Sequence, residues 1–272
     1  MNIGPPSADV RPLDPAVTSI SHWRRIAEHT SAGHISAELL REKANRQVFR
    51  VPICPHSSVI VKFWKRPGIR GTLSRTARIN TSYREWRALN LMHERRVPSP
   101  RPLAYFRLRN ARCRHDEALV LEDLGECQNA ITYVKLLLAE DRFDALACLE
   151  SEFVSISKRM IEIRLIDTDH RVTNFVVTPG GRIVRLDLEH AARVPSLRLS
   201  SRRYGIMLGG LVGTYVFAVQ PCIERAASFA NLLAEELSPP PGVLDCARLE
   251  VDRLLGVQYR ATGIDSRIEL SW

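Results

Sequence analysis

The sequence predicts an α+β chain in which a strand-rich first part is followed by a mainly helical second part. Apolar and polar residues alternate over residues 57–65, the spacing of a half-buried strand. Apolar residues recur at three- to four-residue steps over residues 83–92, the spacing of a helix. Residues 166–189 then hold two short apolar runs joined by a Thr-Pro-Gly-Gly segment, which indicates a hairpin.

The strand-rich part begins after a proline-containing lead segment of residues 1–30, in which one short helix is expected over residues 21–28. A strand over residues 34–51 follows, and Pro52 and Pro55 are expected to mark the turn into the next strand. Further strands are expected over residues 102–109 and 118–122, and further helices over residues 130–138 and 143–164.

The last part of the chain is expected to be helical. Residues 204–223 carry no charge, but four glycines, a glutamine and a proline interrupt the run, so it is shorter than a bilayer requires. We therefore expect a buried helix at this position. Gly209 and Gly213 have the GxxxG spacing, which here favours close helix packing over dimerisation.

The most informative residues are two acids and an amide in the segment 166–189. Asp169 stands five residues before Asn174, and Asp187 follows Asn174 by thirteen residues. Phosphoryl transfer from ATP uses a carboxylate beside the acceptor hydroxyl, an amide oxygen on Mg²⁺ and a second carboxylate that joins Mg²⁺ to the phosphates. The spacing therefore predicts Asp169 as the proton acceptor, with Asn174 and Asp187 as metal ligands. Asp169 as a simple turn cap stays open as the alternative.

Upstream residues narrow the class of protein. Residues 59–64 form an apolar strand that carries Lys62, Glu85 stands near the start of a helix, and residues 97–105 have a Val-Pro-Ser-Pro-Arg-Pro-Leu-Ala-Tyr sequence. Together with the Asp169 loop, these motifs resemble the protein-kinase-like fold. Within that group, the Arg-Glu-Trp helix start and the prolines resemble the lipopolysaccharide kinase (Kdo/WaaP) family, which phosphorylates sugars of the lipid A inner core.

The resemblance implies a two-lobed fold with a small β-rich N-lobe and a larger helical C-lobe, over residues 31–123 and 124–272. It implies ATP and Mg²⁺ as cofactors. It also implies that Lys62 holds the nucleotide phosphates and that Glu85 is its ion-pair partner. Lys65 competes with Lys62 for that role, and Glu85 as an acid favoured by the helix dipole is the other open interpretation. Finally, it places two residues in the hinge that binds adenine, Glu122 and Leu124.

The sequence departs from the kinase pattern in three places. Asp167 and Thr168 replace the His-Arg that usually precedes the catalytic aspartate, and we expect Asp167 to brace the loop. Leu188 and Glu189 follow Asp187 in place of Phe-Gly. No glycine-rich loop precedes Lys62. A kinase-fold pseudoenzyme that binds nucleotide without turnover is therefore the first alternative. We expect His170 to point away from the reacting groups.

Composition agrees with one globular catalytic unit. The chain has 272 residues, of which 45% are hydrophobic and 25% are charged. Its six cysteines are scattered without a Cys-x-x-Cys pair, which indicates reduced thiols and a cytoplasmic protein. The first 30 residues contain no apolar stretch of the kind a signal peptide needs.

The net charge of +9 is unevenly placed. Basic residues without an acid run from Lys62 to Arg84, and a second basic cluster runs from Arg95 to Arg114. A solvated surface is one interpretation. The other is attraction of a polyanionic glycolipid or sugar acceptor, with peripheral contact on the cytoplasmic face of the inner membrane. Nucleic acid is disfavoured because the clusters lack interleaved aromatic residues.

The function that these patterns predict is ATP- and Mg²⁺-dependent transfer of a phosphoryl group to a sugar hydroxyl, in the lipopolysaccharide inner core. A kinase that acts on a protein or on another small molecule is the second alternative. A cationic acceptor such as an aminoglycoside is disfavoured by the basic clusters.

Overall fold

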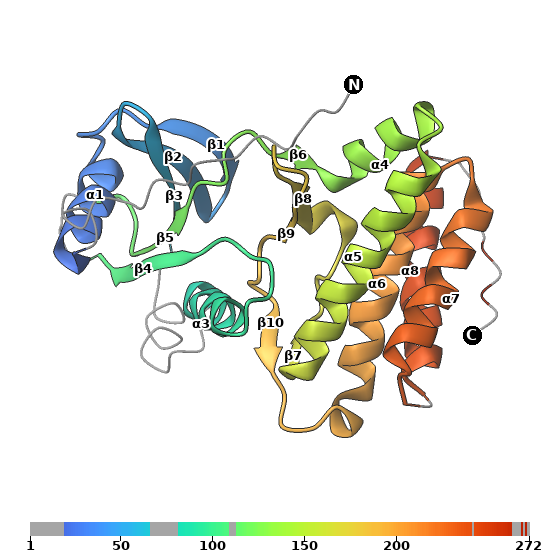
Figure 1. Ribbon diagram of the computed structural model, residues 1–272. Coiled ribbons are helices and arrows are strands. Elements are labelled where there is room, and N and C mark those ends of the chain that lie inside the picture. The colour runs from blue at the N-terminus through green and yellow to red at the C-terminus, as the bar shows by residue number, and fades with distance from the viewer. Residues whose placement is uncertain are drawn as a thin grey trace. The chain divides into compact units, whose positions relative to one another are not determined.

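The computed structural model describes residues 19–65, 81–108, 113–240 and 242–262, together with residues 268 and 270 (Figure 1). The chain divides into two compact units. The first comprises Met1–Arg66 and Leu103–Leu121, and the second comprises Pro67–Pro102 and Glu122–Trp272. The expected lobe boundaries at residues 31–123 and 124–272 stay a prediction.

The first unit is built on a five-stranded sheet with the strand order β1-β2-β3-β5-β4. The β1/β2 and β2/β3 pairs are antiparallel. The helix α1 precedes these strands along the chain. The bounds are α1 Ile20–Ala32, β1 Glu38–Lys43, β2 Arg46–Cys54, β3 Ser57–Trp64, β4 Pro102–Arg107 and β5 Glu117–Glu122.

Two expectations about these strands were wrong. The single strand expected over residues 34–51 is a hairpin of β1 and β2, which turns at Ala44 and Asn45. Pro52 does not mark a turn but lies inside β2. The β1/β2 pairing ends at Glu38 and Arg50, and the register of the β2/β3 pairing shifts just after Pro52. At that point fewer strand hydrogen bonds depend on the N–H that proline lacks.

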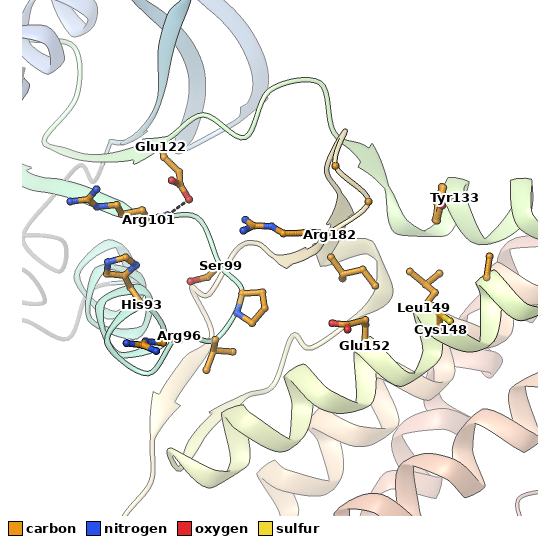
Figure 2. Close-up of a pocket in the computed structure, with 16 residues that line it drawn as sticks. His93, Arg96, Ser99, Arg101, Glu122, Tyr133, Cys148, Leu149, Glu152 and Arg182 are labelled. Atoms are coloured by element: carbon orange, nitrogen blue, oxygen red, sulfur yellow. Dashed lines mark hydrogen bonds between the residues drawn. The ribbon is translucent and has the colours of Figure 1, made fainter. Parts of the chain in front are cut away.

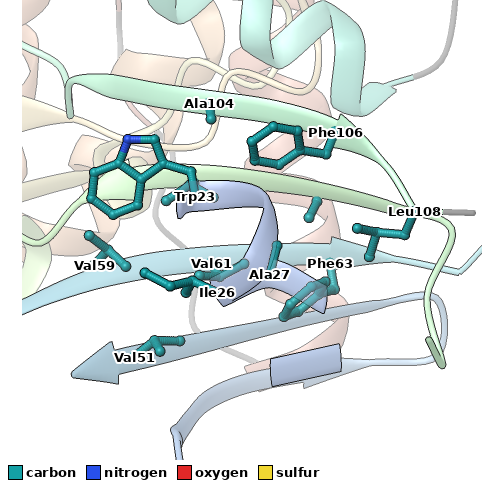
Figure 3. Close-up of a cluster of buried hydrophobic side chains, with 12 residues drawn as sticks. Trp23, Ile26, Ala27, Val51, Val59, Val61, Phe63, Ala104, Phe106 and Leu108 are labelled. Atoms are coloured by element: carbon teal, nitrogen blue, oxygen red, sulfur yellow. The ribbon is translucent and has the colours of Figure 1, made fainter. Parts of the chain in front are cut away.

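The helix α1 covers one face of this sheet, where Trp23, Ile26 and Ala27 meet apolar side chains of the strands (Figure 3). The strand residues include Val61, Phe63 and Phe106. The helix is longer than the expected residues 21–28 because both ends are capped. The Ser19 side chain accepts the His22 N–H, and Gly33 ends the helix at a φ of 79°.

The second unit contains six helices among its described residues, and α5, α6, α7 and α8 run alongside one another in Figure 1. Small sheets of the order β6-β8-β9 and β10-β7 complete it. The helices are α3 Thr81–Glu94, α4 Ala130–Ala139, α5 Phe143–Glu162, α6 Ser201–Val219, α7 Ile223–Leu237 and α8 Val243–Thr262. The strands are β6 Gln128–Asn129, β7 Leu165–Asp167, β8 Phe175–Val177, β9 Ile183–Arg185 and β10 Ala191–Arg193.

The uncharged segment of residues 204–223 forms most of α6, and most of its residues are buried. A Cβ on Gly209 would lie 2.4 Å from the Ala247 carbonyl oxygen, and one on Gly213 would lie 2.9 Å from a methyl group of Leu254. These glycines therefore let α6 and α8 approach closely, which confirms the expected packing role. None of the described helices has the length and apolarity that crossing a bilayer demands.

A buried carboxylate ties three of these helices together. Glu150 of α5 accepts two hydrogen bonds from the Arg225 guanidinium of α7, at 2.9 and 2.8 Å, and a third from the Tyr215 hydroxyl of α6. Burial and the neighbouring Glu150 raise the pKa of Tyr215, so the hydroxyl remains a donor to the carboxylate. These hydrogen bonds connect α5, α6 and α7, and the loop that carries Asp169 follows α5.

Candidate active site

The loop that carries Asp169 lies between β7 and β8. The strand β8 pairs with β9 as the expected hairpin, closed by a turn in which the Gly181 N–H donates to the Thr178 oxygen at 2.8 Å. Gly181 has a φ of 75°, which suits glycine. The strand β7 pairs with β10, and the register places Ala191 opposite Asp167. These short pairings fix both ends of the loop.

Asp169 and Asn174 contact each other directly. The Asn174 amide nitrogen donates to the Asp169 backbone oxygen at 2.8 Å and to its carboxylate at 3.0 Å. The amide oxygen of Asn174 therefore points away from Asp169 and is available to a cation. Arg171 Nε forms an ion pair with the other Asp169 carboxylate oxygen at 3.0 Å. Both Asp169 and Asn174 remain partly exposed, so they are accessible to a ligand.

Arg185 holds the loop through hydrogen bonds, although the sequence patterns did not single this residue out. Its guanidinium is fully buried and donates to the Asp167 carboxylate, to the Asp169 backbone oxygen at 3.0 Å and to the Asn174 backbone oxygen at 3.1 Å. A further hydrogen bond goes to the Leu186 backbone oxygen. One side chain thus connects both candidate catalytic residues to β9. The sequence signal was a lone arginine in an otherwise apolar strand.

Asp167 braces the loop, as expected from its position. It is fully buried, and its carboxylate accepts the Asp169 N–H at 3.0 Å in addition to the Arg185 guanidinium. Burial raises the pKa of the Asp167 carboxyl, while Arg185 and the Asp169 N–H oppose the rise. Its burial removes Asp167 from contact with an acceptor, so Asp169 is the carboxylate that can act as the base.

His170 is fully buried, and its two ring nitrogens contact Ser157 of α5 and Arg185, in line with the expectation that it is not a reacting group. Its Nδ1 accepts from Arg185 Nε at 3.3 Å, so its Nε2 carries the proton and donates to Ser157 Oγ at 2.9 Å. Ser157 in turn donates to the Phe153 oxygen at 2.7 Å. Burial, followed by the Arg185 charge, lowers the pKa of His170 well below its usual value. A neutral His170 is therefore part of the scaffold.

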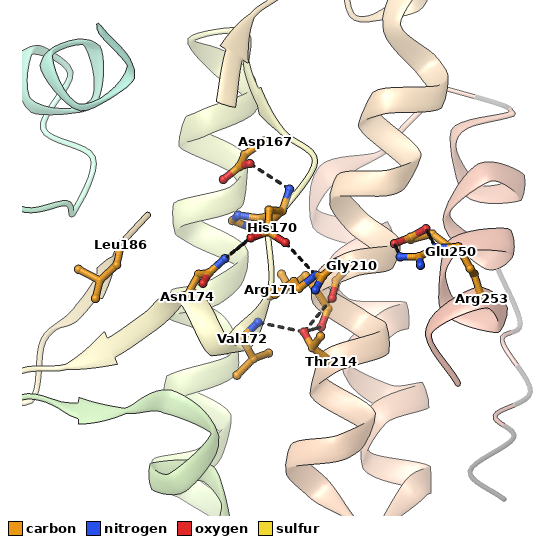
Figure 4. A network of polar contacts seen from close by, with 12 residues as sticks. Asp167, His170, Arg171, Val172, Asn174, Leu186, Gly210, Thr214, Glu250 and Arg253 are labelled. Atoms are coloured by element: carbon orange, nitrogen blue, oxygen red, sulfur yellow. Dashed lines mark hydrogen bonds and ion pairs between the residues drawn. The ribbon is translucent and has the colours of Figure 1, made fainter. Parts of the chain in front are cut away.

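The loop is also fastened to α6. The Val172 N–H donates to Thr214 Oγ1 at 2.9 Å, and the Thr214 hydroxyl donates to the Gly210 oxygen at 2.7 Å (Figure 4). A Cβ on Gly210 would lie 3.1 Å from the His170 oxygen, so the helix passes very close to the loop. The apolar helix that resembled a membrane span therefore positions the active-site loop.

Three carboxylates meet beside the hairpin. One oxygen each from Glu85, Asp187 and Glu189 lie within 4.8 Å of one another. Asp187 has a φ of 52°, a conformation that aspartate tolerates better than most residues. Hard divalent cations prefer such oxygen ligands. The donor set therefore fits Mg²⁺. Glu189 was not predicted as a site residue, although its place two residues after Asp187 was a usable signal.

Lys62 and Lys65 differ in burial. Lys62 lies in β3 with only 9% of its surface exposed, whereas Lys65 is exposed. A lysine held in the interior of a strand favours Lys62 over Lys65 as the phosphate ligand. Lys62 belongs to the first unit and Glu85 to the second. Their ion pair stays a prediction.

The predicted hinge residues lie where β5 ends. Glu122 accepts the Arg101 N–H on its carboxylate at 2.7 Å, and its own N–H donates to the Arg101 oxygen at 3.0 Å (Figure 2). Its side chain lines a cavity of about 980 Å³ with Ser99, Leu149 and Arg182. Leu124 is half-buried in the following loop. Adenine binding by Glu122 and Leu124 stays a prediction.

The two basic clusters are only partly described. Arg66, Arg70, Arg75 and Arg78 lie outside the described residues, as do Arg109 and Arg112. Arg95, Arg96, Arg101 and Arg114 are exposed. The backbone oxygens of Arg95 and Arg96 accept from the Arg159 guanidinium of α5. An acceptor-binding role for either cluster stays a prediction.

The chain has a protein-kinase-like fold, with an α+β first unit and a larger helical unit, as expected. No family model and no curated protein matches the sequence. Among solved structures, the chain is similar to WaaP in complex with acyl carrier protein, at 16% identity and a TM-score of 0.58, over 85% of this chain and 96% of that one. It is also similar to a Toxoplasma gondii specific rhoptry antigen kinase domain, at 12% identity and a TM-score of 0.50, over 81% and 82% of the two chains. The expected resemblance to a WaaP-like kinase fold is confirmed at the level of the fold.

The buried, neutral His170 predicts a specific pH dependence of stability. Its pKa is lower in the folded state than in the unfolded state, so the unfolded chain binds a proton that the folded chain excludes. His170 therefore makes the free energy of unfolding fall as the pH drops below about 6.5, by at most about 1.4 kcal/mol per pH unit. We expect His170→Gln to remove this component. Urea unfolding of both proteins over a pH series measures it, and equal slopes would contradict the assignment.

Proposed function

We propose that this chain is an ATP- and Mg²⁺-dependent phosphotransferase that acts on a hydroxyl of a sugar in the lipopolysaccharide inner core. The observation that carries the proposal is the direct contact between Asp169 and Asn174 in a loop held by buried Arg185. On a kinase-like fold, this arrangement supplies a base and an oxygen ligand at one place. The choice of a sugar acceptor rests on the resemblance of the sequence motifs to the lipopolysaccharide kinase family, and the similarity to WaaP supports the kinase-like fold.

Asp169 is the proposed base. Asn174 and Arg171 hold its carboxylate in one orientation while leaving it partly exposed to an acceptor. The acceptor oxygen forms a bond to the γ-phosphorus, the bond from that phosphorus to the β,γ-bridging oxygen breaks, and ADP leaves. The hydroxyl proton passes to Asp169. Because the transition state is loose, most of the acceleration comes from positioning and charge neutralisation.

Asn174 and Asp187 would hold Mg²⁺, and Glu189, whose carboxylate lies beside that of Asp187, would complete the oxygen environment. When bound, the ion would neutralise charge on the β- and γ-phosphate oxygens. Lys62 would hold the α- and β-phosphates, oriented by Glu85. The hinge residues Glu122 and Leu124 would receive adenine.

The proposed acceptor is a polyanionic glycolipid, for which the basic clusters supply charge complementarity. The proposed location is the cytoplasm, with peripheral contact on the inner membrane, where such an acceptor is available. Because the similar WaaP structure is a complex with acyl carrier protein, acyl carrier protein is a useful further partner to include in a binding assay.

A pseudoenzyme is the second candidate, and one observation favours it. The β1/β2 hairpin turns at Ala44 and Asn45 and contains no glycine, whereas kinases cover the nucleotide phosphates with a glycine-rich loop. Nucleotide binding without phosphate release or transfer would support that alternative. An assay with labelled ATP and a panel of core oligosaccharides, proteins and small alcohols separates the two functions.

The Asp169→Ala substitution tests the proposed base. We expect kcat to fall by about 10² or more while ATP affinity is kept, because Asp169 faces the acceptor and not the nucleotide. Asp167→Asn should lower stability more than it lowers kcat, because Asp167 is buried on Arg185. The exposed Asp252→Ala on α8 is the matched control. If Asp167→Asn lost more turnover than Asp169→Ala with the fold intact, the roles would be exchanged.

The carboxylate cluster makes a second prediction that needs no turnover. ATP with Mg²⁺ should raise the Tm of the wild type, and Asp187→Asn should abolish that rise because it removes the charge that anchors the ion. Glu189→Gln should weaken the Mg²⁺ dependence about tenfold, on the scale of losing a supporting ligand. Glu235→Gln, an exposed change on α7, is the control. A full nucleotide response in Asp187→Asn would count against the metal site.

A further inference from the structure

The segment that connects β10 to α6 is strongly basic. Residues 190–223 contain no aspartate or glutamate, and the first turn of α6 has no acidic residue. Four arginines lie in the first part of this run, from the last residue of β10 to the first turn of α6. They are Arg193, Arg198, Arg202 and Arg203. Within the described part of the chain, none of these four forms an ion pair.

An apolar side chain projects from the middle of these charges. Leu199 is 86% exposed, more than any other large hydrophobic side chain among the described residues. Burying such a side chain in an apolar medium is favourable, so its exposure on a folded surface calls for an explanation. A single exposed leucine is ordinary on a protein surface. Its position between unpaired arginines is what distinguishes Leu199.

The backbone around Leu199 is fixed. Residues Arg198–Ser200 form a 3-10 turn, in which the Ser200 N–H donates to the Leu197 oxygen at 3.1 Å. The Ser201 hydroxyl donates to the Arg198 oxygen at 2.7 Å. The Arg164 guanidinium donates to the Pro195 oxygen at 3.0 Å. Leu199 is therefore presented outward by a defined turn, which we call the Leu199 turn (residues 197–201).

The basic surface continues from Arg193 onto α3. A groove of about 440 Å³ lies between α3 and β10, and its lining includes Arg84, Arg87 and Arg193. Glu94 is the one acidic residue in that lining. Within the described residues, the Arg84 Nε is buried without a hydrogen-bond partner. The groove therefore offers further positive charge to an anionic group beside Arg193.

We propose that the Leu199 turn docks this chain on an anionic lipid bilayer, with Leu199 inserted among the acyl chains and the flanking arginines on lipid phosphates. A soluble polyanion would satisfy the arginines but would leave Leu199 in water. In an anionic bilayer the apolar acyl chains lie directly beneath the negatively charged phosphates, so a leucine and its neighbouring arginines can reach both. One leucine and four arginines give weak and reversible binding, because stable anchoring takes stronger signals.

The Leu199 turn is linked to the Asp169 loop through the β10/β7 pairing. The strand β10 precedes the turn and pairs with β7, and β7 leads into the Asp169 loop. A chain held on the membrane by the Leu199 turn would keep that loop near a membrane-borne acceptor. This consequence rests on the proposed function, but the docking itself does not.

Co-sedimentation of the full chain with lipid vesicles tests the docking. We expect binding to vesicles of phosphatidylglycerol and phosphatidylcholine in equal parts, and little binding to phosphatidylcholine alone. Leu199→Ser should weaken binding about tenfold. Replacing Arg198, Arg202 and Arg203 with serine should weaken it about a hundredfold, at about fivefold for each arginine near an anionic leaflet. Raised salt should weaken wild-type binding by screening the exposed charges.

Matched controls lie on other exposed surfaces. Leu249 of α8 is 69% exposed among charged neighbours, so Leu249→Ser makes the same chemical change away from the turn. Replacing Arg25, Arg248 and Arg260 with serine removes the same number of positive charges as the triple change at Arg198, Arg202 and Arg203. Equal binding by Leu199→Ser and Leu249→Ser, or no sedimentation with the anionic vesicles, would overturn the proposal. Because the assay needs no turnover, the docking can fail while the phosphotransferase proposal stands, and the reverse also holds.

Discussion

The buried guanidinium of Arg185 is the contact on which the rest of the active-site geometry depends. It donates to the side chain of Asp167 and to backbone oxygens of Asp169, Asn174 and Leu186. Arginine suits this position because its planar group presents five donors in a fixed arrangement and stays charged when buried. The Asp167 carboxylate supplies the opposite charge. Without that carboxylate, burial of Arg185 would be strongly unfavourable.

The residues that support the loop are buried, and the proposed reacting residues are partly exposed. Asp167, His170 and Arg185 are fully buried and direct their polar atoms to one another, to the loop backbone and to Ser157. Asp169 and Asn174 stand in the same loop but remain partly exposed. Burial, followed by the Arg185 charge, lowers the pKa of His170, so this supporting group stays neutral. The exposed pair is thereby held in one geometry, which is the condition for positioning a reacting hydroxyl.

Local patterns predicted much of the fold because they depend on neighbours in sequence. The helix at α3, the β8/β9 hairpin and the Asp169–Asn174 pair all follow from short-range spacing. The β1/β2 hairpin was missed because its turn at Ala44 and Asn45 contains no glycine or proline and lies within the polar run of residues 41–47. Pro52 was misplaced because its tolerance depends on where a partner strand ends.

Residues that act through distant contacts could not be found in this way. Arg185 of β9 contacts Asp167 of β7, a strand of a different sheet, and Glu85 lies beside Asp187 from a helix far earlier in the chain. The exposure of Leu199 is likewise a property of the folded surface. Sequence spacing identified which side chains have the right chemistry. Only the tertiary structure identified those that support them.

A double-mutant cycle on Asp167 and Arg185 tests most directly whether this ion pair organises the loop. Urea unfolding would be measured for the wild type, Arg185→Met, Asp167→Asn and the combined variant. We expect Arg185→Met to lower the free energy of unfolding by about 3–5 kcal/mol, because it leaves Asp167 buried and uncompensated. The combined variant should recover part of that loss. A loss below about 1 kcal/mol in Arg185→Met, or additive effects in the combined variant, would contradict the account.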